Sequence, residues 1–91
     1  MNFGQAVEQL KSGQRVARAG WNGKGMWVCL MPAAVIPEGL VNERTRKFVP
    51  SGELRVGAYL VLWTAHGVWQ PGWNASTPDI LADDWEVVPG A

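Results

Sequence analysis

Apolar side chains recur with a helical period at the start of the chain. The spacing i, i+3, i+4 and i+7 is followed by Phe3, Ala6, Val7 and Leu10. Residues with this spacing share one face of a helix. Asn2 and Gln5 form the pattern of a capping box, and Gly13 is a typical helix end. The sequence therefore predicts a helix over residues 3–11.

Shorter apolar runs predict strands over Arg15–Arg18, Met26–Met31, Ala58–Thr64, Val68–Gln70 and Trp85–Val88. Ala58–Thr64 is apolar on both faces, which indicates a strand inside a sheet or at a subunit contact. Pro78 after Ser76-Thr77 predicts a second, short helix over about residues 78–83. Together these elements predict an α+β fold, with the N-terminal helix packed on an antiparallel sheet of about four to five strands and the second helix before the last strand.

The middle of the chain has a weaker pattern. Pro32, Pro37 and Pro50 interrupt it, and Leu40–Phe48 is compatible with a short basic helical turn. We expect a single domain over residues 1–91 with an irregular insertion over about 32–57. No apolar run approaches the ~18 residues of a membrane span and no leader pattern opens the chain, so we expect a cytoplasmic protein.

The net charge is zero, but the charges are segregated. All eight Lys and Arg lie between Lys11 and Arg55, where three Glu reduce the net charge to +5. Residues 56–91 carry four acidic side chains and no basic one. This balance disfavours a dedicated duplex-DNA binder. The segregation fits docking between subunits, a local cationic pocket for a small anion, or an ordinary solvated surface.

Catalytic and metal-binding patterns are weak. His66 is the single histidine and lies in a predicted turn, and Cys29 is the single cysteine and lies in an apolar strand. Neither has the partners that a nucleophile or a zinc ion requires. Helix capping accounts for Asp79, and solvation accounts for Asp83-Asp84. We therefore expect no enzyme, no cofactor and no metal.

Six tryptophans in 91 residues require an explanation. We interpret four of them as core or interface residues of the strands: Trp27, Trp63, Trp69 and Trp85. The other two lie in glycine-rich loops, each beside an asparagine: Trp21-Asn22 and Trp73-Asn74. A loop needs no indole to fold, whereas an aromatic ring beside an amide suits a nucleotide or a sugar. On this pattern alone, ligand binding and plain packing are equally supported.

Two long motifs stand in order along the chain. The first consists of Met1–Ala6 followed by Ala17–Met26, and the second is Gly72–Val88, with the pattern W-x-x-S-x-x-D-x-L-x-x-D-W. Together they resemble the second type of the Thoeris anti-defence family of phages and prophages, over about residues 1–31 and 56–88. Residues 32–55 match no pattern of this family.

The resemblance implies a sponge rather than an enzyme. Such a protein binds a cyclic nucleotide immune signal in the host cytoplasm, typically of the glycocyclic ADP-ribose type and in some members a cyclic oligonucleotide. It keeps the intact signal from the bacterial effector. The resemblance also implies a homotetramer with ligand pockets between subunits. Carried over by position, the ligand-binding residues are Arg18, Trp21, Asn22, Lys24, Trp73, Asn74, Ser76 and Asp79.

We expect a division of roles among these residues. The indoles would stack on the base or close over the ribose, and the amides and Asp79 would read hydroxyl or base edges. Arg18 and Lys24, or a basic residue among Arg44, Arg46 and Lys47, would hold the pyrophosphate. The alternative is an oligomeric module for single-stranded nucleic acid or oligosaccharide, or a small structural adaptor of a phage.

Overall fold

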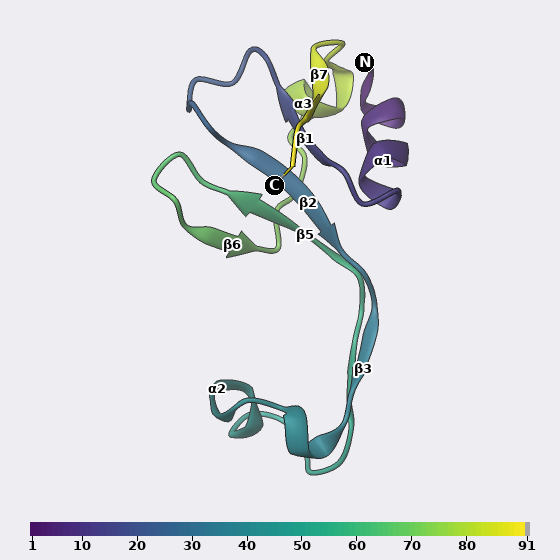
Figure 1. Ribbon diagram of the computed structural model, residues 1–91, viewed down its shortest axis with the longest axis vertical. Helices are drawn as coiled ribbons and strands as arrows, with labels where there is room; N and C mark the ends of the chain where they lie inside the picture. The colour runs from purple at the N-terminus through teal and green to yellow at the C-terminus, as the bar shows by residue number, and fades with distance from the viewer. Residues whose placement is uncertain (91) are drawn as a thin grey trace.

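The computed structural model describes residues 1–90 and has a five-stranded sheet, two helices beside it, and a long two-stranded arm with a short helix at its far end (Figure 1). The helices are α1 (Phe3–Lys11), the 3₁₀ turn Glu38–Leu40, α2 (Glu43–Arg46) and α3 (Thr77–Leu81). The strands are β1 (Arg15–Arg18), β2 (Trp27–Met31), β3 (Ala34–Ile36), β4 (Leu54–Val56), β5 (Tyr59–Trp63), β6 (Trp69–Pro71) and β7 (Trp85–Val88). The α+β class is confirmed.

The five-stranded sheet has the order β6-β5-β2-β1-β7, and every neighbouring pair is antiparallel. β5 lies inside the sheet between β6 and β2, which agrees with the apolar character of both its faces. β7 pairs with β1 in a register that sets Trp85 opposite Arg18. Arg18 of the first sequence motif and Trp85 of the second therefore lie on neighbouring strands. No helix within residues 1–90 has the length and apolarity of a membrane span.

α1 covers the sheet through its apolar stripe. The capping box is present, since the Gln5 amide donates to Asn2 Oδ1 at 2.8 Å and the Asn2 amide donates to Gln5 Oε1 at 2.9 Å. Ala6 and Leu10 are buried in a core with three sheet residues, Val16, Val28 and Trp85. α1 thus covers one face of β1, β2 and β7 and removes it from water.

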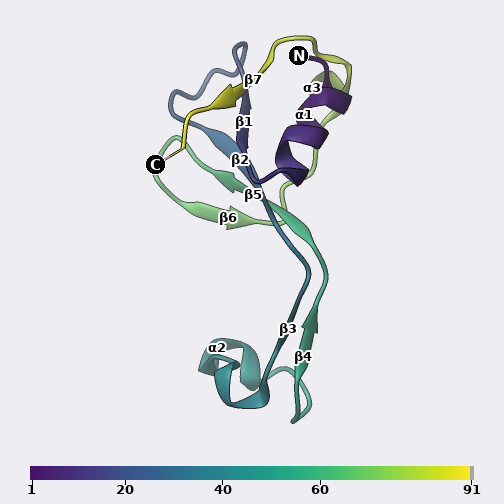
Figure 2. The ribbon, with the colours of Figure 1, turned by 45° about the vertical axis from the view of Figure 1, so that its right-hand side comes forward.

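Two short paired strands form the arm within residues 32–57, the segment predicted as an irregular insertion. β3 and β4 pair in regular register from Ala34↔Val56 to Ile36↔Leu54, beyond the end of the β2–β5 ladder (Figure 2). The strand-breaking residues Pro32, Pro37 and Pro50 flank these strands instead of interrupting them. At the far end of the arm, α2 is capped by a hydrogen bond from the Thr45 amide to Asn42 Oδ1.

The sheet face opposite α1 carries an aromatic row. Side chains alternate along a strand, so Trp27 points away from the face on which its neighbour Val28 is buried. Trp27 stacks on Trp63 with ring centroids 5.8 Å apart, and Trp69 meets Trp27 edge-on at 6.3 Å. Trp69 remains 44% exposed. A core position is therefore wrong for Trp69, and its interpretation as an interface residue stays a prediction. Trp85 is in the core as predicted, 2% exposed.

Candidate functional site

Three indoles from separate parts of the chain meet at one end of the sheet. Trp21 of the β1–β2 loop and Trp73 of the β6–α3 connection lie 6.2 Å apart between ring centroids, nearly edge to face. Both meet buried Trp85 edge-on, at 5.4 and 6.3 Å. Trp21 and Trp73 are half-buried against the core. Of the two interpretations that the sequence left open for these indoles, the structure shows packing against the core, and both residues stay half-buried.

Gly72 sets the position of Trp73. Its φ of +84° is a backbone conformation that favours glycine, and it turns the chain sharply after β6. In this turn the amides of Gly72 and Trp73 both donate to the carbonyl oxygen of Leu60, at 2.9 and 3.0 Å. These two hydrogen bonds tie the backbone of Trp73 to β5 and so position its indole.

An ionic cluster lies beside the indoles. Arg18 donates from Nε to Asp84 Oδ1 at 2.8 Å and from Nη1 to Asp79 Oδ1 at 2.9 Å. The ring N–H of Trp21 donates to the same oxygen of Asp79 at 3.1 Å. The backbone amide of Gly20 donates to Asp84 Oδ2 at 2.7 Å. Asp84 is therefore a structural partner of the loop, and its interpretation as a merely solvated residue is wrong.

Asp79 combines three roles in one nearly buried side chain. It forms the predicted cap of α3 in a capping box with Ser76, whose hydroxyl accepts from the Asp79 amide at 3.2 Å and whose amide donates to Asp79 Oδ2 at 3.1 Å. Its carbonyl oxygen accepts from Trp85 Nε1 at 2.9 Å. The carboxylate also accepts from Arg18 and Trp21. Asp79 thus joins the cap of α3 to the ionic cluster and the indoles.

The titration of this cluster follows from its contacts. Burial by itself raises the pKa of Asp79, but the hydrogen bonds from Trp21, Arg18 and Ser76 outweigh it and lower the pKa to about 2. The Arg18 guanidinium likewise holds the pKa of Asp84 below its usual value. Asp84 and then Asp79 raise the pKa of Arg18 further. All three groups are therefore charged over the physiological range.

The remaining predicted residues lie at the rim. Asn22, Lys24 and Asn74 are exposed, and Asn74 Nδ2 donates to the carbonyl of Gly72 at 3.5 Å. A hollow of about 340 Å³ beside the loop has Arg18, Trp21 and Lys24 in its lining, with Glu86 across from them on β7. The structure therefore gathers Arg18, Trp21, Trp73, Ser76 and Asp79 into one cluster. It leaves the two asparagines and Lys24 facing solvent.

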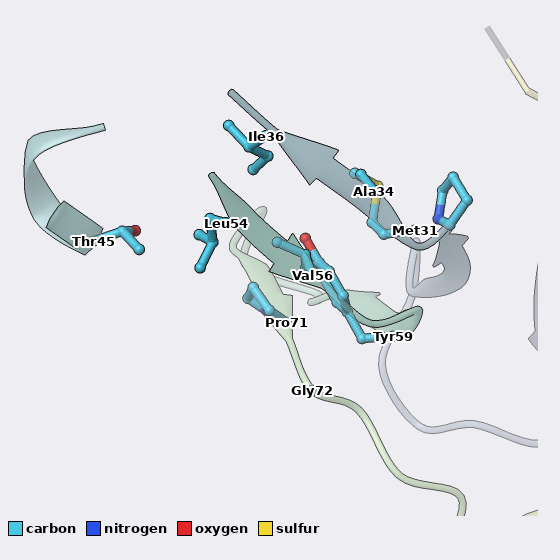
Figure 3. A pocket seen from close by; sticks show the side chains of 10 residues that line it. Met31, Ala34, Ile36, Thr45, Leu54, Val56, Tyr59, Pro71 and Gly72 are labelled. Atoms are coloured by element: carbon cyan, nitrogen blue, oxygen red, sulfur yellow. The ribbon is translucent and has the colours of Figure 1, made fainter. Parts of the chain in front are cut away.

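The arm encloses a second concave region that the sequence did not indicate. An apolar hollow of about 630 Å³ lies between the arm and the edge of the sheet (Figure 3). Its lining includes Met31, Ile36, Leu54, Val56, Tyr59 and Pro71. An adjoining hollow of about 560 Å³ is lined by Asn42, Arg44, Thr45, Lys47, Phe48, Tyr59 and Pro71. The only sequence signal for it is the basic segment Leu40–Phe48. Within residues 1–90, no three His, Cys, Asp or Glu side chains gather as a metal site.

Comparison with known proteins identifies the family. The family model described as Tad2-like, the Thoeris anti-defense 2-like domain, matches residues 1–88. The chain belongs to the Thoeris anti-defense 2 family. Thoeris anti-defense 2 of Bacillus phage SP01 is 32% identical to it over 98 residues, which cover 97% of this chain and 94% of the relative. Both matches run through the arm, which the two sequence motifs did not cover. Membership in the Thoeris anti-defense 2 family assigns the chain an anti-defence role.

Proposed function

We propose that the chain binds a cyclic nucleotide immune signal in the bacterial cytoplasm and holds it intact, so that the signal does not reach its effector. The preferred class is the glycocyclic ADP-ribose type, with cyclic oligonucleotides as the second class. The observation that carries the proposal is the pair of half-buried indoles Trp21 and Trp73, which hold each other in place and offer rings for a base to stack on. The chain's membership in an anti-defence family supports the same proposal. Each stack of a base on such a ring is worth ~1–3 kcal/mol.

The protonation states of the cluster support holding rather than turnover. A carboxyl group that acts as a general acid near neutral pH needs a raised pKa. Both aspartates have lowered pKa values, Asp79 because of hydrogen bonds from Trp21, Arg18 and Ser76, and Asp84 because of the hydrogen bond from Arg18. His66 lies in an exposed turn away from them. We therefore propose a non-enzymatic protein.

The ligand phosphates require a cation other than Arg18. Two carboxylates neutralise its guanidinium, which leaves little charge for an anion. Lys24 is exposed at the rim of the Trp21 hollow. Arg46 is engaged by the carbonyls of Glu38 and Val41. We assign phosphate binding to Lys24, together with basic residues of the arm of a second copy.

The exposed area supports self-association. The chain exposes 6372 Å², whereas a compact monomer of 9.9 kDa exposes about 5,200 Å². The excess exceeds the ~800 Å² that each partner buries in a standard interface. The arm continues the β2–β5 ladder as two strands alone, and two strands without further packing are marginally stable in water. These properties support the homotetramer with pockets between subunits that the family resemblance implies.

A second candidate function rests on the arm. Arg44, Lys47, Phe48 and Tyr59 line one hollow, and cations interleaved with aromatic rings suit single-stranded nucleic acid. An oligosaccharide module or a phage structural adaptor are further forms of this alternative. The single-stranded nucleic acid form differs from the first proposal in that it binds at the arm, so Trp21 would be dispensable for binding.

Calorimetry separates the two proposals. Glycocyclic ADP-ribose, a cyclic dinucleotide and a single-stranded oligothymidylate are titrated into the chain and into Trp21→Ala. Saturable binding of a cyclic nucleotide that Trp21→Ala abolishes and the control Trp69→Ala retains supports sequestration. Binding of the oligothymidylate alone, with a steep salt dependence and no effect of Trp21→Ala, supports the alternative.

A further inference from the structure

Asp84 holds the start of the Trp21 loop through three contacts. Its two carboxylate oxygens accept from Arg18 Nε at 2.8 Å and from the Gly20 amide at 2.7 Å. Its carbonyl oxygen accepts from the Ala19 amide at 3.0 Å. Three successive residues of the loop are therefore tied to one residue of the opposite end of the chain.

The Asp84 carboxylate lies so close to Gly20 that it leaves little room for a side chain there. A Cβ atom at this position would lie 2.7 Å from Asp84 Oδ2, closer than a real Cβ contact allows. The backbone of Gly20 is not in the left-handed region, so its φ does not demand glycine. A side chain at residue 20 would therefore require the Asp84 carboxylate to move away from the loop backbone.

The same group of residues also fixes the indole of Trp21. The Trp21 amide donates to the Arg18 carbonyl at 3.2 Å, so the loop turns directly at the residue that Asp84 binds. Arg18 also contacts Asp79 Oδ1, the oxygen that receives the ring N–H of Trp21. The backbone and the ring of Trp21 are therefore both anchored through Arg18 and its two carboxylate partners.

We infer that Asp84 is the positioning residue of the Trp21 site, and this inference rests on the proposed function. Asp84 holds residues 18–21 so that Trp21, Asn22 and Lys24 are presented to a ligand in one arrangement. A loop that is ordered before binding spares the cost of ordering it afterwards, and a partly populated competent state lowers the apparent affinity in proportion.

This role has a kinetic signature. Loss of a side chain that contacts the ligand shortens the lifetime of the complex, which raises the dissociation rate constant. Loss of a positioning residue lowers the fraction of molecules ready to bind, which reduces the association rate constant and leaves dissociation nearly unchanged. The two roles are therefore distinguishable for the same affinity loss.

Two variants remove the hold independently. Asp84→Asn removes the charge that pairs with Arg18, and Gly20→Ala pushes the intact carboxylate away from the Gly20 amide. Asp83→Asn is the matched control, because Asp83 is the adjacent, exposed aspartate. Stopped-flow tryptophan fluorescence with glycocyclic ADP-ribose gives both rate constants. Amide hydrogen exchange of residues 19–25 reports loop order without ligand.

The expected result is that Asp84→Asn and Gly20→Ala each lower the association rate constant by about tenfold, with dissociation unchanged. Exchange of residues 19–25 accelerates in both, and Asp83→Asn matches the unmodified chain. The inference is overturned if the dissociation rate constant rises instead, or if exchange of the loop does not change. If the unmodified chain binds no cyclic nucleotide, the proposed function fails, and the exchange data alone still decide whether Asp84 orders the loop.

Discussion

The ring N–H of Trp21 donates to Asp79 Oδ1 at 3.1 Å, and this bond joins the loop after β1 to the first turn of α3. It orients an indole by a group that also caps a helix and pairs with Arg18. The site and the fold therefore share the same polar groups. Variants of this cluster are expected to change stability and ligand binding together.

Trp21→Phe retains a ring in the loop and removes the N–H. Because a hydrogen bond to a charged group contributes about 1.5–3 kcal/mol, we expect the free energy of unfolding to fall by about 2 kcal/mol. Urea unfolding measures the change. Trp69→Phe, on the exposed side of the aromatic row, is the control and should stay within about 0.5 kcal/mol of the unmodified chain. Equal losses in the two variants would contradict the assigned bond.

Asp79 gives the cluster a defined pH dependence. Its pKa falls from the ordinary 3.8 to about 2 in the folded chain. The stability that it contributes is therefore complete above pH 3.8 and is lost as the pH falls through about 2. We expect Asp79→Asn to lose about 2 kcal/mol at neutral pH, as for weakened hydrogen bonds to a charged group, because Asp84 still pairs with Arg18.

The measurement is urea unfolding at a series of pH values from 5 to 2. The difference in stability between the unmodified chain and Asp79→Asn should shrink steadily below about pH 4. A difference that stays constant over this range would show that the carboxylate charge contributes nothing to folding.

The arm should determine the oligomeric state. Leu54 lies on β4 and lines the apolar hollow, so Leu54→Asp places a charge where we expect a second copy. Sedimentation equilibrium should give about 40 kDa for the unmodified chain and a mass near 9.9 kDa for the variant. Leu81→Asp, at a leucine of α3 that is 74% exposed, is the control. Dissociation by Leu81→Asp but not by Leu54→Asp would move the interface away from the arm.

Lys24 should supply part of the phosphate binding. We expect Lys24→Gln to weaken binding of glycocyclic ADP-ribose by about tenfold and to reduce its dependence on salt, as for the loss of one ionic contact. Lys11→Gln, at the end of α1, is the charge-matched control. Calorimetry at two salt concentrations measures both effects. An unchanged affinity in Lys24→Gln would assign the phosphates to the arm alone.

Local patterns predicted most of the secondary structure. The capping box of Asn2 and Gln5 and the helical spacing after it lie within a few residues, and α1 has the predicted bounds 3–11. The second helix is displaced by one or two residues, to Thr77–Leu81, because Ala82 already adopts an extended backbone. Helix ends depend on such single residues, which periodicity does not resolve.

The same patterns could not predict the strands of the arm. β3 and β4 have three residues each, too few to show a period, and neighbouring prolines indicated breaks. They are strands because they extend the longer β2–β5 ladder, a relationship between distant segments. The sequence predicted a short basic turn over Leu40–Phe48. It did not indicate that residues of this turn line a hollow together with Tyr59.

The candidate site was predicted in its members but not in its contacts. Arg18, Trp21 and Asp79 were selected as ligand residues from motifs, and the structure brings them together. The pairing of Arg18 with Asp84 could not be predicted, because 66 positions separate the two residues in the sequence. It follows from the pairing of β1 with β7, which sets Arg18 opposite Trp85, the residue after Asp84. The ligand roles of these residues stay predictions.

The central claim is that the chain holds a cyclic nucleotide and does not convert it. The most direct measurement mixes the chain in excess with glycocyclic ADP-ribose, removes the protein by ultrafiltration, and identifies by mass spectrometry what heat releases from the retained protein. If the chain sequesters the nucleotide, the nucleotide disappears from the filtrate and returns, chemically unchanged and in full yield, after denaturation. A filtrate that still contains all of the nucleotide, or a released product of different mass, would contradict the central claim.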